Sequence, residues 1–183
     1  ATTAVARMVA LSAIAAVLTT FVMGALSDKL KNRKMFISVG YILWGIVTGM
    51  FGFISKENVA NLFNLTDEAK ILGTTVWFVI LMDIVMTFMG STSNDAAFQA
   101  WVTDVTVPKQ RPLVETVLSV VGTVSSFAVT GVGSFAQAGT ISYKIFFLGL
   151  GFVVTLCGIV GLFVIKDPPR TAEIKDSSSY LAD

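Results

Sequence analysis

The chain has 183 residues, of which 54% are hydrophobic and 14% are charged, and its formal net charge is +1 at pH 7. Soluble domains contain roughly 45–50% apolar and about 25% charged residues, so this composition excludes an ordinary water-soluble domain. Histidine is absent and Cys157 is the single cysteine, which removes the commonest general base, the commonest metal ligand and any disulfide within the chain. We therefore expect a membrane protein that is not an enzyme and needs no cofactor.

Long apolar segments follow one another along the chain. A helix needs about 20 predominantly apolar residues to cross roughly 30 Å of hydrocarbon, and the expected spans are residues 4–26, 35–55, 71–98, 113–138 and 145–165. These segments are rich in Gly, Ala, Ser and Thr, which let membrane helices approach closely, and they lack the short polar-apolar alternation of a β-barrel. The expected fold class is all-α, a polytopic membrane helical bundle over residues 1–166. Residues 167–183 are expected to be a cytoplasmic tail or interdomain linker.

The connections between these spans differ in length. Residues 27–34 are too few to let the first two spans separate, so we expect an antiparallel hairpin. Residues 56–70 form the longest expected loop. The third span continues as a helix to Val105, and Pro108 ends it. Pro112 then lies near the start of the fourth span, where the first turn of a helix tolerates proline.

The distribution of basic residues predicts the orientation. If the loop Lys29 to Lys34 is cytoplasmic, nine basic residues lie on that side and four on the other, in agreement with the positive-inside rule. The cytoplasmic set is Lys29, Lys31, Arg33, Lys34, Lys109, Arg111, Lys166, Arg170 and Lys175. We expect a multi-pass protein of the cell membrane with its C-terminal end in the cytoplasm, in contact with the lipid bilayer and with no nucleic acid.

The first hairpin carries a motif with a definite order of residues, G-A-L-S-D-K-L-K-N-R-K from Gly24 to Lys34. This order resembles the signature loop between helices two and three of the major facilitator superfamily, Gly-x-Leu-Ala/Ser-Asp-Arg/Lys-x-Gly-Arg-Arg-Lys, from which Lys31 and Asn32 depart. In that family the motif holds the cytoplasmic ends of the two halves of a transporter together. By this resemblance, the gating residues are Gly24, Asp28, Lys29, Arg33, Lys34 and Arg111.

The same resemblance has consequences for the fold and its partners. If the hairpin joins helices two and three, the five spans are helices two to six of a twelve-helix transporter. They form the N-terminal half of a major facilitator fold that lacks its first helix. The implied partners are the missing first helix, the C-terminal half of the same protein and a small-molecule substrate.

The third span carries polar residues on one helical stripe. Asp83, Thr87, Gly90, Asn94 and Trp101 fall within about 60° of one another at 100° per residue. An ionisable residue at the centre of a membrane helix costs roughly 2.5–3.5 kcal/mol on insertion scales, so it indicates a functional site by default. The structural alternative for Asp83 is that it accepts a hydrogen bond from a neighbouring helix. Asp95 lies about 18 Å further along the helix, and its structural alternative is to mark the inner membrane boundary.

Residues 90–101 carry a second resemblance, to helix four of the glycoside-pentoside-hexuronide branch, the melibiose carriers and their relatives. Asp95, Phe98 and Thr103 fit its pattern, and Asp95 would then be a ligand of the coupling cation. In that branch helix two adds acidic ligands, whereas Ala16 and Thr20 stand at the comparable places here. A proton is therefore the expected coupling ion, with sodium as the alternative.

The function expected from these features is secondary active transport of a small polar solute, a sugar or glycoside, by cation-coupled alternating access. The candidate binding residues are Asp95, Asp83, Asn94 and Thr87. The stripe and the estimated depth near the middle of the membrane favour Asp83 as the carrier of the ion, whereas the resemblance favours Asp95. We prefer Asp95, because a residue-level resemblance outweighs a depth estimated from the expected start of the helix. The alternatives are an exporter of drugs or metabolites in the same superfamily and a membrane sensor that does not transport.

Overall fold

The computed structural model describes residues 2–30 and 32–167. Arg170, Lys175 and nearly all of the expected tail or linker, residues 168–183, lie outside the described residues, as do Ala1 and Lys31. Their expected positions therefore stay predictions.

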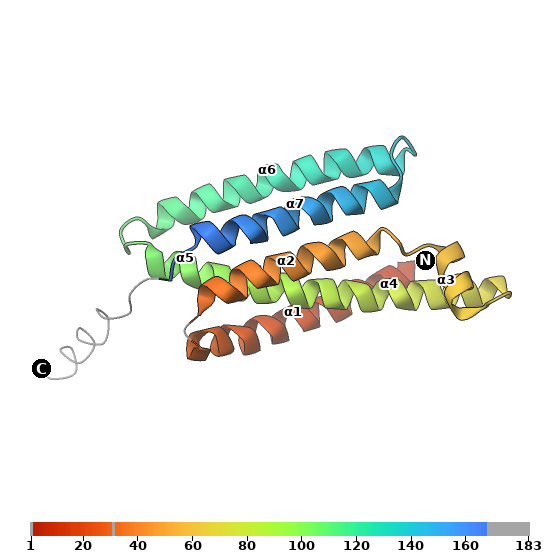
Figure 1. Ribbon diagram of the computed structural model, residues 1–183, viewed down its shortest axis with the longest axis horizontal. Coiled ribbons are helices and arrows are strands. Elements are labelled where there is room, and N and C mark those ends of the chain that lie inside the picture. The colour runs from red at the N-terminus through yellow and green to blue at the C-terminus, as the bar shows by residue number, and fades with distance from the viewer. Residues whose placement is uncertain (1, 31, 168–183) are drawn as a thin grey trace, which may run out of the picture.

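The described residues form helices and no strand (Figure 1). The helices are α1 (Thr2–Leu30), α2 (Arg33–Phe51), α3 (Lys56–Phe63), α4 (Glu68–Gly90), the π-helix η1 (Ser91–Phe98), α5 (Gln99–Val105), α6 (Arg111–Gln137) and α7 (Tyr143–Val164). Five helical segments in this part of the chain are long and apolar enough to span a membrane, and one of them is the continuous run of α4, η1 and α5, Glu68–Val105. The expected all-α membrane bundle is confirmed.

The second helix ends earlier than the apolar pattern predicts. It stops at Phe51, and Ser55 then begins a further short helix, because its side chain accepts a hydrogen bond from the backbone N–H of Asn58 at 3.1 Å. The segment 56–70, expected to be a loop, is therefore helical as α3 until Asn64, whose left-handed backbone (φ 50°) ends the helix. The Ser55 side chain thus caps the start of α3, and the left-handed backbone of Asn64 ends it.

The third span continues to Val105, as expected, but residues 91–98 form a π-helix that the apolar pattern did not predict. The side chains of Thr92 and Ser93 bond back to the carbonyls of Phe88 and Met89, at 2.7 and 2.8 Å. Such back-bonding competes with the regular helical ladder. π-helical turns are rare and occur frequently at functional sites.

Glycines let α2 and α7 pack with their backbones in contact. A Cβ added at Gly151 would lie 2.6 Å from the backbone nitrogen of Gly49, and one added at Gly158 would lie 2.8 Å from the carbonyl oxygen of Ser38. This close approach is typical of helix packing in membranes. From one edge of the bundle to the other, the order of the helices is α6, α7, α2, α4 and α1 (Figure 1).

The π-helix lies against both α1 and α2. A Cβ added at Gly40 of α2 would lie 2.6 Å from the Cβ of Ser93, and one added at Gly24 of α1 would lie 4.0 Å from the Cβ of Ala96. The side chains of Ser93 and Ala97 are fully buried. Small residues on α1, α2 and η1 therefore let η1 pack closely between α1 and α2. The neighbouring polar side chains line the site described next.

Candidate functional site

A chain of hydrogen bonds joins α2 to the carboxylate of Asp95 on η1. The hydroxyl of Tyr41 donates to Oδ1 of Asn94 at 2.8 Å, and Nδ2 of Asn94 donates to Oδ1 of Asp95 at 3.0 Å. The hydroxyl of Ser91 donates to the other carboxylate oxygen at 2.9 Å. Both oxygens of Asp95 thus accept a hydrogen bond, and the amide of Asn94 is held in one orientation.

Asp95 lies in a pocket of about 270 Å³ between α2, α4 and η1, lined by Trp44, Met86, Thr87, Gly90, Ser91, Asn94 and Asp95. Gly90 lets the indole of Trp44 lie directly over α4, since a Cβ at position 90 would be 3.0 Å from Cε2 of that ring. The pocket combines an aromatic wall with four polar side chains from one continuous helix.

The structure brings three of the four candidate binding residues together and leaves Asp83 apart. Thr87, Asn94 and Asp95 line the pocket and Asp83 does not. The hydroxyl of Ser12 on α1 instead donates to Asp83 Oδ2. Three members of the expected stripe, Thr87, Gly90 and Asn94, line the pocket. A role for Asp83 in the same site stays a prediction.

Asp95 has no basic partner among the described residues, whose two ion pairs both involve Arg33. In the same part of the chain, no three or more His, Cys, Asp and Glu side chains gather in a way that could hold a metal ion. Asp95 is therefore a single carboxylate whose charge no lysine or arginine at ion-pair distance balances. A carboxylate in a membrane-spanning helix is costly unless a proton or a cation neutralises it.

The end of the bundle at the first hairpin holds a buried arginine between two carboxylates. Arg33 Nη2 lies 2.6 Å from Oδ1 of Asp28, at the end of α1, and Nη1 lies 2.8 Å from Oδ2 of Asp104, at the end of α5. The Arg33 side chain is only 11% exposed. This cluster ties α1, α2 and α5 together, and breaking a buried ion pair by removing one partner is strongly destabilising.

Asp104 is a partner of Arg33 that the sequence pattern did not predict. Position alone could not place it, because it lies 71 residues after Arg33 on another helix. A usable signal was its location at the end of the third span, where the hairpin topology brings it to the same end of the bundle as the basic motif.

The other expected gating residues surround this cluster without joining it. Gly24 lies against η1 as described above, and Lys29 is exposed at the end of α1. The backbone N–H of Lys34 donates to Oδ1 of Asp167 at 3.0 Å. Arg111 donates to the carbonyls of Thr103 and Thr106 at 3.0 and 3.4 Å, so it caps the end of α5.

The comparison with known families agrees with this arrangement of helices and motif. The model of the Major Facilitator Superfamily matches residues 2–179. The chain belongs to the major facilitator superfamily. Members of this superfamily are transporters rather than enzymes, so the protein is a multi-pass membrane transporter. No curated protein and no solved structure matches the chain.

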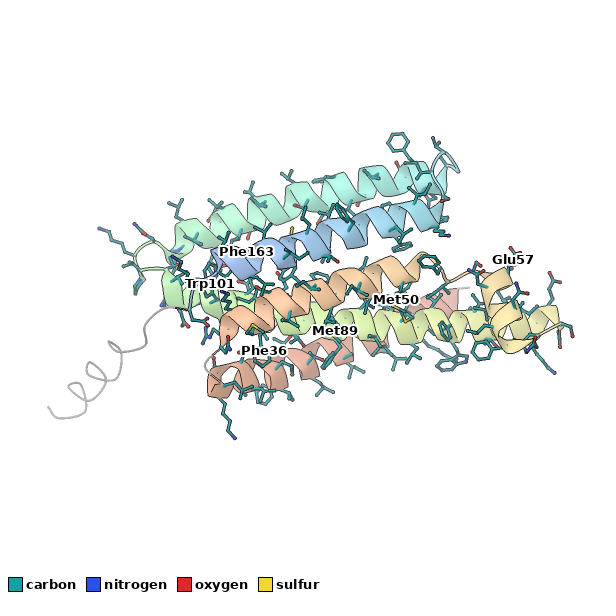
Figure 2. All side chains as sticks on the ribbon, in the orientation of Figure 1. Phe36, Met50, Glu57, Met89, Trp101 and Phe163 are labelled. Carbon is teal, nitrogen blue, oxygen red and sulfur yellow. The ribbon has the colours of Figure 1, made fainter. Side chains whose placement is uncertain are left out.

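In this major facilitator protein, the segment that leaves α7 is attached beside the Arg33 cluster. The indole N–H of Trp101 donates to the carbonyl of Lys166 at 3.0 Å, and Asp167 accepts from Lys34 as noted above. Trp101 lies at the end of the bundle where α7 ends (Figure 2). The indole also packs against the buried cluster of Ile37, Ala97 and Ile165. Trp101 thus packs against buried side chains at the expected cytoplasmic end of the bundle, and it does not line the pocket.

A larger hollow, about 500 Å³, runs along α6 and is lined by Glu115, Thr116, Ser119, Val120, Thr123, Val124 and Phe127. Every one of these residues comes from the same helix, so no second element encloses a ligand there. α6 makes its main contact with α7 and is exposed along its length. We therefore regard the smaller pocket at Asp95 as the candidate transport site, and the hollow as an uncovered face of α6.

Proposed function

We propose that the protein is a secondary transporter that moves a small polar solute, a sugar or glycoside, by cation-coupled alternating access, with Asp95 carrying the coupling ion. One observation carries the proposal: a single carboxylate lies in a pocket between α2, α4 and η1, with hydrogen-bond donors on both oxygens and no basic partner among the described residues. Intramembrane carboxylates without a fixed counter-charge mark ion pathways.

The coupling ion in this proposal is a proton, and sodium is the alternative. A hard cation takes several oxygen ligands, whereas a proton needs one titratable carboxylate. The pocket contains one carboxylate, and α1 carries Ala16 and Thr20 where the melibiose-like branch has acidic ligands. The resemblance of Asp95, Phe98 and Thr103 to that branch supports a sugar or glycoside as the solute.

The Arg33 cluster acts as the gate in this proposal. Neutralising Arg33 from both α1 and α5 keeps three helix ends together at the cytoplasmic side. The polar face of α6 is uncovered in the described part of the chain. We propose that the first helix and the second half of the carrier cover it. Polar groups such as Glu115 and Ser119 at membrane depth require cover by protein or water.

The test compares two single substitutions in the full-length carrier in proteoliposomes. We expect Asp95→Asn to abolish accumulation driven by a proton gradient while preserving part of the energy-independent counterflow, because a permanently neutral side chain mimics the protonated carrier. Asp83→Asn is the matched control, since Asp83 lies in the same span outside the pocket and should reduce accumulation less. The measurement is uptake of labelled sugars at varied pH and sodium concentration.

Each other outcome of this test has a defined meaning. The reverse ranking of the two variants would move the coupling site to Asp83. Full uphill transport by both variants would show that these residues do not carry the ion. Absence of counterflow by the wild-type carrier with every solute would instead favour a membrane sensor that does not transport.

A second candidate function rests on the same pocket. The indole of Trp44 and the carboxylate of Asp95 line one cavity, and an aromatic face beside a carboxylate also suits an organic cation. This combination favours an exporter of cationic drugs or metabolites. Competition between tetraethylammonium and sugars for uptake separates the two functions, since a sugar carrier is inhibited by its sugar and not by the cation.

A further inference from the structure

Trp44 occupies a wall of the pocket in a position that its surroundings determine. A Cβ at Gly90 would lie 3.0 Å from Cε2 and 3.1 Å from Cζ2 of the indole, so the six-membered part of the ring covers the α4 backbone. The ring centroid of Tyr41 lies 5.5 Å away, with the two planes tilted by 57°. The indole is half-buried and lines the cavity.

The other walls supply neutral hydrogen-bonding groups. Asn94 uses one of its two amide N–H bonds on Asp95 and its oxygen on Tyr41, so the second N–H remains for a ligand. The hydroxyl of Thr87 lines the cavity and makes no hydrogen bond to the described residues. Ser91, which donates to Asp95, completes this row one turn after Thr87.

From this juxtaposition we infer that Trp44 is the stacking surface of the substrate site and that the solute presents a neutral pyranose ring to it. The inference rests on the proposed function, in which Asp95 is reserved for the coupling ion. When that carboxylate is protonated, the lining residues carry no net charge, and an organic cation loses its counter-charge.

A pyranose ring matches both kinds of wall at once. Its C–H face is apolar and carries partial positive charge, which suits the negative face of an aromatic ring. Its hydroxyl groups project from the rim, where Thr87, Ser91 and Asn94 lie along one helix. The volume of about 270 Å³ lies just below the roughly 300–1,000 Å³ of pockets for drug-sized ligands. This part of the site therefore has room for a single sugar ring.

The experiment measures equilibrium binding to the purified full-length carrier in nanodiscs. The probes are labelled methyl glucopyranoside and methyl galactopyranoside, with sorbitol and galactitol as open-chain polyols that lack a ring face. We expect Trp44→Ala to weaken binding of the better pyranoside by about tenfold, equivalent to ~1.4 kcal/mol. Trp44→Phe keeps an aromatic face, and its affinity should stay within about threefold of wild type, less than ~0.7 kcal/mol.

Two further variants control for folding and for a general effect of losing an indole. Trp77→Ala removes a tryptophan that is 64% exposed and outside the pocket, and it should leave pyranoside binding unchanged. Gly90→Ala keeps Trp44 but displaces its ring, so it should weaken pyranoside binding in the same direction as Trp44→Ala. The open-chain polyols should bind the wild-type carrier more weakly and respond little to either substitution at Trp44.

The outcomes distinguish this inference from the proposed function. If Trp44→Ala binds the pyranosides as well as wild type, or if sorbitol and galactitol bind as tightly as the pyranosides, the stacking role is wrong. The loss of accumulation in Asp95→Asn would then still support proton-coupled transport. If no pyranoside binds the wild-type carrier while tetraethylammonium does, the sugar function fails and the stacking inference fails with it.

Discussion

Arg33 shows how one residue can connect the signature motif to the rest of the bundle. Its guanidinium is buried and contacts a carboxylate from the motif itself, Asp28, and a second one from the far end of the third span, Asp104. Each carboxylate therefore holds one end of a different helix against α2. In the proposed function this cluster is the gate.

We expect Asp28→Asn to shift the carrier towards inward opening and to slow turnover severalfold, while substrate binding survives. Asp104→Asn should have the same effect, because it removes the other contact of Arg33. The measurements are counterflow rate and the accessibility of engineered cysteines on the cytoplasmic side. Asp67→Asn is the control, since Asp67 only caps α4 at the opposite end. Unchanged turnover and accessibility in both variants would show that the motif does not act as a gate and only helps to set the topology.

At the scale of elements, α2 and α7 depend on glycines at their contact. Gly151 and Gly149 lie two residues apart on α7, yet their surroundings differ completely. A Cβ at Gly151 would lie 2.5 Å from the carbonyl oxygen of Gly45, whereas a Cβ at Gly149 would meet nothing within 4 Å. Backbone atoms cannot move aside as a flexible side chain can, so position 151 requires glycine and position 149 does not.

We expect Gly151→Ala to lower the free energy of unfolding by about 1–3 kcal/mol, the usual effect of overpacking. Gly149→Ala is its matched control and should be neutral or should stabilise the helix by up to ~1 kcal/mol, because alanine has the higher helix propensity. Reversible unfolding of the full-length carrier in mixed detergent micelles measures both. Equal stability of the two variants would contradict the close contact between α2 and α7.

At the scale of the whole molecule, the two ends of the bundle differ in their basic residues and in the connections between helices that lie there. The first hairpin, the connection between α5 and α6 and the end of α7 lie at one end, and α3 and the connection between α6 and α7 lie at the other (Figure 1). Trp101 and Glu57 mark these two ends in Figure 2. The basic motif is thus on the same side as Lys109 and Lys166, as the positive-inside argument requires.

Cysteine labelling in intact cells tests the orientation. In a cysteine-free background, with Cys157 replaced, we expect Asn32→Cys and Arg170→Cys to be protected from an impermeant thiol reagent until the membrane is opened. Asn64→Cys should react from outside, because Asn64 ends α3 at the opposite end of the bundle. Labelling of Asn32→Cys from outside in intact cells would show that the predicted orientation is wrong.

The sequence by itself determined the properties that depend on composition along the chain. Hydrocarbon thickness sets the length of a span, so the number and approximate place of the membrane helices could be predicted from apolar segments alone. The helix bounds near Ser55 and Asn64 differed, because a side-chain cap at Ser55 and a left-handed backbone at Asn64 decide them locally. The motif from Gly24 to Lys34 indicated the family because its residues lie in one short segment.

Only the tertiary structure decided which polar groups meet. Asp83 and Asp95 both lie in the third span, and a regular helical period puts Asp83, not Asp95, on one stripe with Asn94. In the folded bundle Asp95 meets Ser91 and the Tyr41-bound Asn94, while Asp83 meets Ser12 of α1. Helical phase and contacts between distant helices depend on packing, and a hydropathy pattern contains no information about either. For the same reason the pairing of Arg33 with Asp104 became visible only in the folded bundle.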